Sequence, residues 1–167
     1  MTKPQVSIVM GSDSDLEIMQ EAQKVLADFH IANEVQILSA HRSPNQVASF
    51  SKRLRKRGVK VVIAGAGGAA HLAGVIASHT TVPVIGVPIP SVLDGMDSLL
   101  ATVQMPKGVP VATVTIGKAG AANAGILAAQ ILAVRSKSLQ GKLSRHKVKL
   151  TQSVIEKNKK LKQRFCS

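Results

Sequence analysis

The sequence of 167 residues is poor in aromatic residues, with no Trp, no Tyr and three Phe. Its single cysteine, Cys166, stands next to the last residue, which excludes an internal disulfide bond and a zinc site built from cysteines. No apolar run approaches the roughly 20 residues of a transmembrane helix, and Met1 to Gln5 has no signal-peptide pattern. We therefore expect a soluble, cytoplasmic protein with an aliphatic core.

Acidic residues are also scarce. Nine Asp and Glu stand against 22 Lys and Arg, giving a formal net charge of +13. Eleven of the 22 basic residues lie between Arg135 and Arg164, and a second cluster runs from Lys52 to Lys60. Neither cluster is interleaved with aromatic side chains that stack on single-stranded bases. We interpret both as solvated helix surfaces with no nucleic-acid or membrane partner. A nucleic-acid surface and attraction of anionic metabolites remain the alternatives.

Short apolar runs alternate with helix-length segments along the chain. The expected strands are Val6–Met10, Val35–Leu38, Val59–Ala64, Val82–Ile89 and Val109–Ile116. The expected helices are Leu16–Phe29, Pro44–Arg57, Ala70–His79, Asp97–Val103 and Lys118–Val134. Strands this uniformly apolar are typical of a parallel sheet that is covered by helices on both faces.

The pattern therefore predicts a single domain over residues 1–167 with a three-layer α/β/α architecture, flavodoxin-like or Rossmann-like. A further C-terminal helix is expected from Leu139 to about Ile155. The lysine-rich end, about residues 157–167, is expected to fray.

Ligands of such sheets bind beyond the carboxyl ends of the strands. The segments that follow the strands are "GSDSD" (Gly11–Asp15), "SAHRSP" (Ser39–Pro44), "GAGGAAH" (Gly65–His71), "PIPSVLDG" (Pro88–Gly95) and "GKAGAAN" (Gly117–Asn123). Nearly every residue capable of chemistry is thus expected at one edge of the sheet.

The first segment has two interpretations. Ser14 and Glu17 have the spacing of a helix capping box. Ser12 and Asp15 would also place a hydroxyl and a carboxylate beside free backbone N–H groups, which suits a phosphate or ribose hydroxyls. Because a carboxylate beside a phosphate is unfavourable, we expect Asp15 to take the sugar hydroxyls. Capping and ligand binding both stay open.

In the second segment, Ser43 and Pro44 make an ordinary helix start, for which His41 and Arg42 are not needed. A guanidinium at a helix N-terminus opposes the positive end of the helix dipole, so an anion between them would explain Arg42. His41 can titrate near neutral pH, which suits proton transfer to or from a ring atom. A polar turn without function is the alternative.

The third segment is rich in glycine but has neither the G-x-G-x-x-G nor the P-loop spacing, so nothing indicates NAD or ATP. His71 is either a site residue or a buried structural histidine. The small residues of Gly117–Ala133 favour burial against another subunit, with packing inside the subunit as the alternative. No metal-ligand cluster or Ser–His–Asp spacing stands out. The residues point to metal-free acid–base chemistry on an anionic ligand.

Together the segments resemble the class I N5-carboxyaminoimidazole ribonucleotide mutases of purine biosynthesis, also named as the catalytic subunit of phosphoribosylaminoimidazole carboxylase. The resemblance covers about Val6 to Leu132. It rests on "VMGSDSD", "SAHRSP", "AGAGGAAHLAG", "PVIGVP", "DSLLATVQMPKGVPVATV" and "GKAGAANAG", which occur in the family's order and nearly its spacing.

The resemblance implies an enzyme that moves a carboxylate from the exocyclic nitrogen of its nucleotide substrate to ring carbon C4, through transient carbon dioxide and without a cofactor or metal. His41 falls on the family's general acid and base. Ser12 and Arg42 match positions at the phosphate, and Asp15 matches the ribose position. The positions that line the pocket of the base and carboxylate are matched by Ser39, Gly67, His71 and Leu72. A homo-octamer is also implied.

The sequence departs from the family pattern in three places. Ala73 stands where the family usually has Pro, the segment Pro88–Gly95 is one residue shorter than usual, and the residues after Leu132 match only loosely. We assign no site residue in the shortened segment. The basic tail is expected to affect assembly or solubility more than chemistry.

Three alternatives remain. The family's other class carboxylates aminoimidazole ribonucleotide directly with carbon dioxide, although "GGAAHLAG" and "VQMPKGVP" favour the mutase class. A non-catalytic flavodoxin-like binding module and a basic nucleic-acid binder come from other functional classes.

Overall fold

The strands form one parallel sheet in the order β2-β1-β3-β4-β5 in the computed structural model, which describes residues 3–165. The strands are β1 (Val6–Met10), β2 (Asn33–Ile37), β3 (Val61–Gly67), β4 (Val84–Ile89) and β5 (Ala112–Thr113). The helices are η1 (Asp13–Asp15), α1 (Leu16–Asp28), α2 (Pro44–Arg57), α3 (Leu72–Ser78), α4 (Met96–Val103), α5 (Gly117–Ala133) and α6 (Lys137–Phe165). This strand order is that of flavodoxin-like folds, so the predicted fold class is confirmed.

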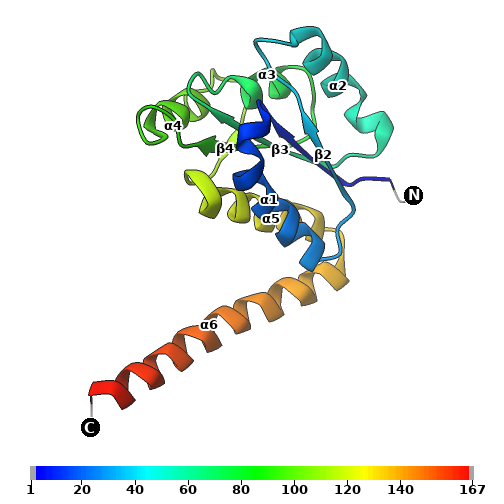
Figure 1. The fold of residues 1–167 in the computed structure, drawn as a ribbon. Coiled ribbons are helices and arrows are strands. Elements are labelled where there is room, and N and C mark those ends of the chain that lie inside the picture. Colours follow the sequence, from blue (N-terminus) through cyan, green and yellow to red (C-terminus); the bar gives the residue numbers. More distant parts are fainter. Residues whose placement is uncertain (1–2, 166–167) are drawn as a thin grey trace.

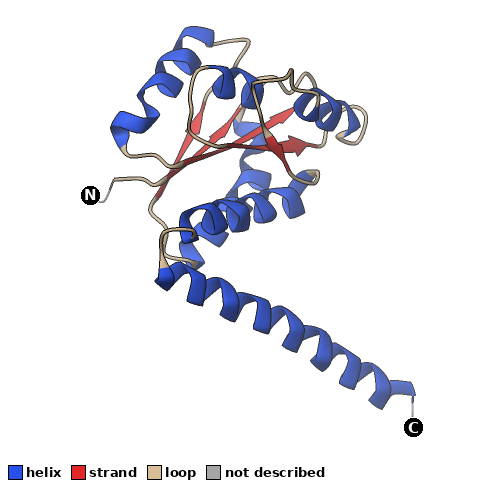
Figure 2. Ribbon diagram, turned by 180° about the vertical axis from the view of Figure 1, so that it is seen from behind, coloured by secondary structure: helices blue, strands red, loops and turns tan. Residues whose placement is uncertain are grey.

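Helices cover both faces of the sheet, as Figures 1 and 2 show. Alternate residues of β1 point to opposite faces. Ile8 and Met10 pack with α1 and α5 in one apolar cluster. Val9 packs with Val47 of α2 and Leu72 of α3 in the other. Because β1, β3 and β4 lie between two apolar layers, they carry the continuous aliphatic runs seen in the sequence.

The bounds of α2 agree with the sequence prediction for a local physical reason. Pro44 occupies the first turn, where its missing N–H costs nothing. Gly58 ends the helix with a φ of 87°, in the left-handed region that glycine adopts most readily. Between these ends, Val47, Phe50 and Leu54 recur at helical spacing and are buried.

The edges of the sheet differ from expectation. The strand expected over Val109–Ile116 is reduced to β5, Ala112–Thr113, and Pro110 in that run has no N–H to donate to a ladder. On the other edge, Val35 and Ile37 of β2 are 37% and 56% exposed. Only the three middle strands, β1, β3 and β4, are therefore covered by helices on both faces.

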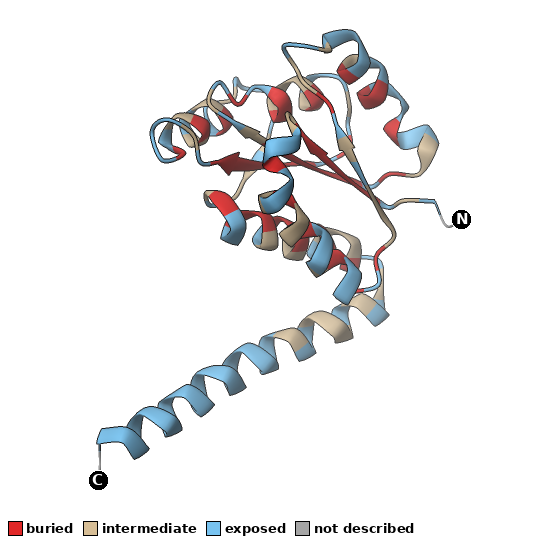
Figure 3. Ribbon diagram, in the orientation of Figure 1, coloured by how far each residue is buried: buried red, intermediate tan, exposed pale blue. Residues whose placement is uncertain are grey.

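The final helix is longer than predicted. It runs to Phe165, beyond the expected end at Ile155, and Figure 3 shows it leaving the body of the protein. Leu139 and Leu143 pack against the core, whereas every described residue after His146 is exposed. Fraying of about residues 157–167 stays a prediction, and Cys166 lies outside the described residues. Within residues 3–165, no helix is both long enough and apolar enough to cross a membrane.

The small residues of α5 pack inside the subunit, which is the alternative that the sequence left open. Eight residues of this helix are buried, all of them Gly or Ala. A Cβ atom added to Gly125 would lie 2.9 Å from the Cβ of Val25 and 3.0 Å from the carbonyl oxygen of Ala22, both in α1. Glycine at this position therefore sets the close approach of α5 to α1.

Substitution of this glycine tests that contact. Gly125→Ala is expected to lower the free energy of unfolding by about 1–3 kcal/mol, because the added methyl group has no room. Gly141→Ala in α6 is the matched control: its nearest neighbour would be Arg145 Nη1 at 3.6 Å, an ordinary contact. The control should gain up to about 1 kcal/mol from helix propensity. Urea unfolding followed by circular dichroism measures both, and equal shifts would contradict the packing argument.

Candidate functional site

One cavity at the carboxyl ends of the strands brings the predicted site residues together. It has a volume of about 530 Å³. It lies where strand order reverses, between β1 and β3, the usual ligand position in such sheets. Its lining includes all eight of them: Ser12, Asp15, Ser39, His41, Arg42, Gly67, His71 and Leu72.

The loop after β1 forms a capping box, but with other residues than expected. The hydroxyl of Ser12 accepts the backbone N–H of Ser14, and Asp15 Oδ2 accepts the N–H of Ser12 at 3.1 Å. The predicted pair of Ser14 and Glu17 is therefore wrong. The box encloses η1, a turn of 3-10 helix that precedes α1 and shifts the capping register.

Asp15 is a buried carboxylate at the cavity wall. It is 8% exposed, and desolvation raises its pKa above the ordinary value of 3.8. Hydrogen bonds from the N–H of Ser12 and the hydroxyl of Ser14 oppose this shift. Burial of a carboxylate costs stability, and a surface turn would not require it. Such a residue is a candidate for ligand binding.

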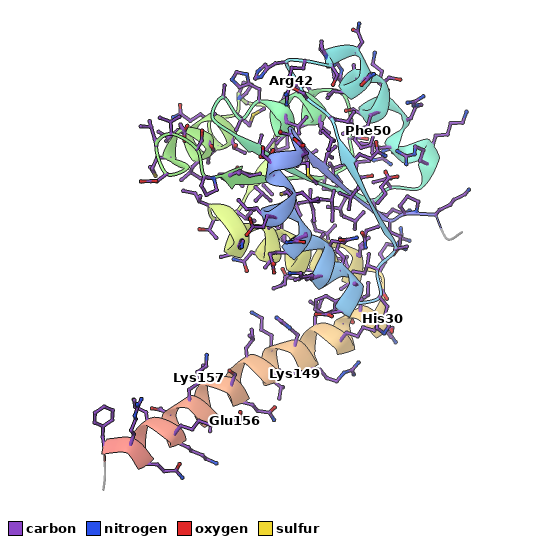
Figure 4. The ribbon with its side chains drawn as sticks, in the orientation of Figure 1. His30, Arg42, Phe50, Lys149, Glu156 and Lys157 are labelled. Atoms are coloured by element: carbon purple, nitrogen blue, oxygen red, sulfur yellow. The ribbon has the colours of Figure 1, made fainter. Side chains whose placement is uncertain are left out.

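The loop after β2 is held by side chains rather than by a simple cap. Ser43 is at the N-cap position of α2, yet its hydroxyl bonds to the backbone N–H and C=O of Ser39 instead of to the helix. Arg42 Nη2 donates to the carbonyl oxygen of Gly11 at 2.7 Å, and its Nε donates to the Ser39 hydroxyl at 3.3 Å. The guanidinium thus joins the loops after β1 and β2, and Arg42 lines the cavity at the end of the body away from α6 (Figure 4).

His41 and His71 form a pair across the cavity. His41 Nε2 lies 2.8 Å from His71 Nδ1, and the ring planes meet at 81° with centroids 4.9 Å apart. A hydrogen bond between two imidazole nitrogens needs a proton on one and a lone pair on the other. His71 stands at the N-cap position of α3 and is exposed, so the buried structural histidine considered from the sequence is wrong.

The loops after β3 and β4 close the remaining sides. Ser98 of α4 is fully buried; its hydroxyl accepts the N–H of Gly68 at 2.9 Å and donates to the carbonyl of Ile89 at 2.7 Å. This bridge fixes the two loops beside each other. Pro90 and Ser91 also line the cavity.

Sequence reasoning assigned no role to Ser91 or Ser98. Position alone marks Ser91, which lies two residues after the end of β4. Ser98 gave no signal, because a serine inside an expected helix is commonplace.

The arrangement offers hydroxyls, a guanidinium, a buried carboxylate and two titratable imidazoles to one ligand. A guanidinium and hydroxyls suit a phosphate, and the imidazoles suit proton transfer. Among residues 3–165, no three His, Cys, Asp or Glu side chains gather in a way that could hold a metal ion.

Fold and cavity together define an α/β protein with one candidate site at the switch point of its sheet, lined by a guanidinium, a carboxylate and two imidazoles. Residues 5–153 match the profile of the family described as AIR carboxylase, and the chain belongs to this family. The match reaches beyond Leu132, so the family resemblance extends into α6.

Similar proteins agree with this assignment. The N5-carboxyaminoimidazole ribonucleotide mutase of Bacillus subtilis is 52% identical over 160 residues, covering 95% of this chain and 99% of that protein. The protein of the same name from Pyrococcus horikoshii is 51% identical over 162 residues, covering 96% and 90%. Among solved structures, Treponema denticola PurE matches with a TM-score of 0.86 and 30% identity, covering 95% of this chain and 99% of that one.

The buried carboxylate makes a prediction for pH dependence. Because burial raises the pKa of Asp15, its ionisation destabilises the fold as pH rises from the ordinary pKa of 3.8 through the raised one. Asp15→Asn removes this cost, so its unfolding free energy relative to wild type should increase as pH rises above 3.8.

Asp13→Asn is the control with the opposite sign. The Ser12 hydroxyl, which donates to Asp13 Oδ1 at 3.0 Å, lowers the pKa of this exposed carboxyl. Its ionised form is therefore favoured in the folded state, and the stability of Asp13→Asn relative to wild type should fall as pH rises through the lowered pKa toward 3.8. Urea unfolding at several pH values measures both; parallel curves for Asp15→Asn and wild type would contradict the effect of burial.

Proposed function

We propose that this chain catalyses the conversion of N5-carboxyaminoimidazole ribonucleotide to 4-carboxy-5-aminoimidazole ribonucleotide in purine biosynthesis. The names of the relatives supply the reaction. The observation that carries it is the placement of His41, beside Arg42 and opposite His71, in one cavity with the hydroxyl-bearing loop after β1. The role proposed for each residue follows from the functional group that it carries.

Groups of different charge in the cavity bind different parts of the substrate. Arg42 and Ser12 take the phosphate, because a guanidinium and a hydroxyl both donate hydrogen bonds to phosphate oxygens. Asp15 takes the ribose hydroxyls as an acceptor. Ser39, Gly67 and Leu72 surround the heterocycle and its carboxylate. The small residues from Ala66 to Ala69 leave room for carbon dioxide and present no nucleophile to it.

One imidazole serves both proton transfers. The bond between the exocyclic nitrogen and the carboxylate carbon breaks, carbon dioxide leaves, and the nitrogen takes a proton from His41 in its charged form. C4 then attacks carbon dioxide, and the neutral His41 removes the C4 proton. The proton given in the first step is recovered in the second, so no net proton is consumed.

His71 is proposed as a positioning residue for His41. Its Nδ1 lies within hydrogen-bond distance of His41 Nε2, so it orients the ring and fixes which nitrogen carries the proton.

Kinetics of three histidine variants test the mechanism. His41→Asn is expected to lower kcat by about 100-fold or more, the usual scale for a lost acid–base group, while nucleotide binding is largely kept. His71→Asn should lower kcat less and alter the pH profile of kcat. His79→Asn is the control, because His79 is exposed at the end of α3 and does not line the cavity. Turnover of the substrate by a His41→Asn enzyme at the wild-type rate would overturn the proposal.

Direct carboxylation of aminoimidazole ribonucleotide is the second candidate, favoured by the description of the matching family as AIR carboxylase. The same purified enzyme distinguishes the two reactions. The mutase converts N5-carboxyaminoimidazole ribonucleotide without added bicarbonate. Efficient turnover of aminoimidazole ribonucleotide at low bicarbonate and without ATP would instead establish the carboxylase.

A homo-octamer in the cytoplasm belongs to the same proposal. His41, Arg42 and His71 are exposed in the single chain, whereas chemistry with free carbon dioxide needs a closed and dry pocket. A neighbouring subunit would supply the missing cover.

The exposed apolar stripe of α6 supports a contact of this kind. Leu150, Val154, Leu161 and Phe165 follow Leu143 at spacings of seven and four residues, so they lie on one side of the helix. All four are at least half exposed, between 50% and 77%.

Assembly can be tested on the two sides of this helix. Wild-type protein should have the mass of eight chains of 17.5 kDa by light scattering. Leu150→Glu combined with Leu161→Glu should give smaller species, because burying carboxylates in an apolar contact is costly. Gln152→Glu with Gln163→Glu on the opposite side makes the same change in charge, is the control and should keep the octamer. A monomeric wild-type protein at micromolar concentration would contradict this assembly.

A further inference from the structure

A second cavity lies at the opposite edge of the sheet from the candidate active site. It has a volume of about 730 Å³ and is bordered by Gln5 and Lys60, which immediately precede β1 and β3, and by the connection from α5 to α6. Figure 4 places His30, which lines this cavity, at the base of α6 and Arg42 at the far end of the body. The two cavities therefore cannot share one small ligand.

One part of this cavity is apolar. Phe29 and Ile31 follow α1 and are buried, with 6% and 4% exposure. Ile131 and Leu132 near the end of α5 and Leu139 in the first turns of α6 are half-buried. These side chains come from three separate segments, so they form a wall that a flat or aliphatic body could cover.

The rest of the lining carries positive charge. Lys60, Arg135 and Lys142 come from three different segments, and His30, which precedes them in the sequence, also lines the cavity. None of the twelve lining residues is Asp or Glu. The three salt bridges within residues 3–165 use none of these cations. Lys142 Nζ donates to the carbonyl of Phe29 at 2.7 Å, which leaves its charge without a carboxylate partner in the described part of the chain.

We propose that this cavity binds an organic phosphate with an apolar or aromatic body, of the size of a nucleoside monophosphate. Like charges gathered around one hollow repel each other, and a bound dianion relieves that repulsion. The guanidinium of Arg135 matches phosphate geometry, and the ammonium groups of Lys60 and Lys142 add charge to it. The apolar wall would pack against the apolar or aromatic part of the ligand. The cavity volume falls within the range of small-molecule sites.

Binding is measured with AMP as the probe, by calorimetry on protein carrying Arg42→Gln, so that the proposed substrate site contributes little. One AMP per chain is expected to bind. Lys60→Gln with Arg135→Gln in the same background should weaken this binding at least about tenfold, equivalent to about 1.4 kcal/mol. Lys52→Gln with Lys56→Gln removes the same charge from the exposed side of α2 and is the matched control, with unchanged affinity expected.

Two further measurements locate the ligand and show whether both its phosphate and its apolar body contribute to binding. In wild-type protein with labelled methyl groups, AMP should shift the NMR signals of Ile31 and Ile131, a result that does not depend on a variant folding. Adenosine and inorganic phosphate should each bind more weakly than AMP. The proposal is overturned by the absence of saturable binding, by full affinity in Lys60→Gln with Arg135→Gln, by methyl shifts confined to the other cavity, or by equal affinity for AMP and either fragment.

Discussion

Parallel pairing of β1 with both β2 and β3 is the constraint on which the candidate site depends. The chain leaves β1 toward one side of the sheet, returns, and continues on the other side, so the loops after these strands diverge from a common edge. The loops that carry Ser12, His41 and His71 are separated by long stretches of sequence, yet they meet around one cavity. Helix packing on both faces fixes the sheet and thereby the positions of these side chains.

Hydrogen bonds of polar side chains hold together the loops that the sheet brings to one edge. Arg42 donates to the carbonyl of Gly11, Ser43 closes on Ser39, and Ser98 bridges the loops after β3 and β4. These bonds connect loops rather than extend helices or strands, which makes the site rigid without enlarging the core. The cost falls on Asp15, whose buried carboxyl is held by two hydrogen bonds beside the ligand cavity. A buried carboxylate that lowers stability at the wall of a cavity is characteristic of a ligand-binding site.

The edge of the candidate site differs from the opposite edge and α6 in its charge and in its exposed apolar surface. The edge with the catalytic candidates combines a few cations with hydroxyls, whereas the opposite edge and α6 hold most of the unpaired basic residues. The exposed half of α6 carries an apolar stripe that no part of the described chain covers (Figure 3). A helix of this kind gains stability from packing more than from propensity, so its length beyond the body is consistent with a contact between chains.

The sequence by itself determined the middle of the sheet, the helices α1, α2 and α5 nearly to the residue, and the loops that line the candidate site. Aliphatic runs, Pro44 at a helix start and a glycine after Arg57 are local signals, and at these positions the tertiary packing agrees with them. Only the tertiary structure decided the pairing of His41 with His71, the bridge made by Ser98, the shift of the capping box to Ser12 and Asp15, and the cationic cavity at the far edge. Apart from the capping box, which follows the local turn η1, each of these depends on distances between segments that are remote in sequence. No periodicity or spacing along one chain encodes such a distance.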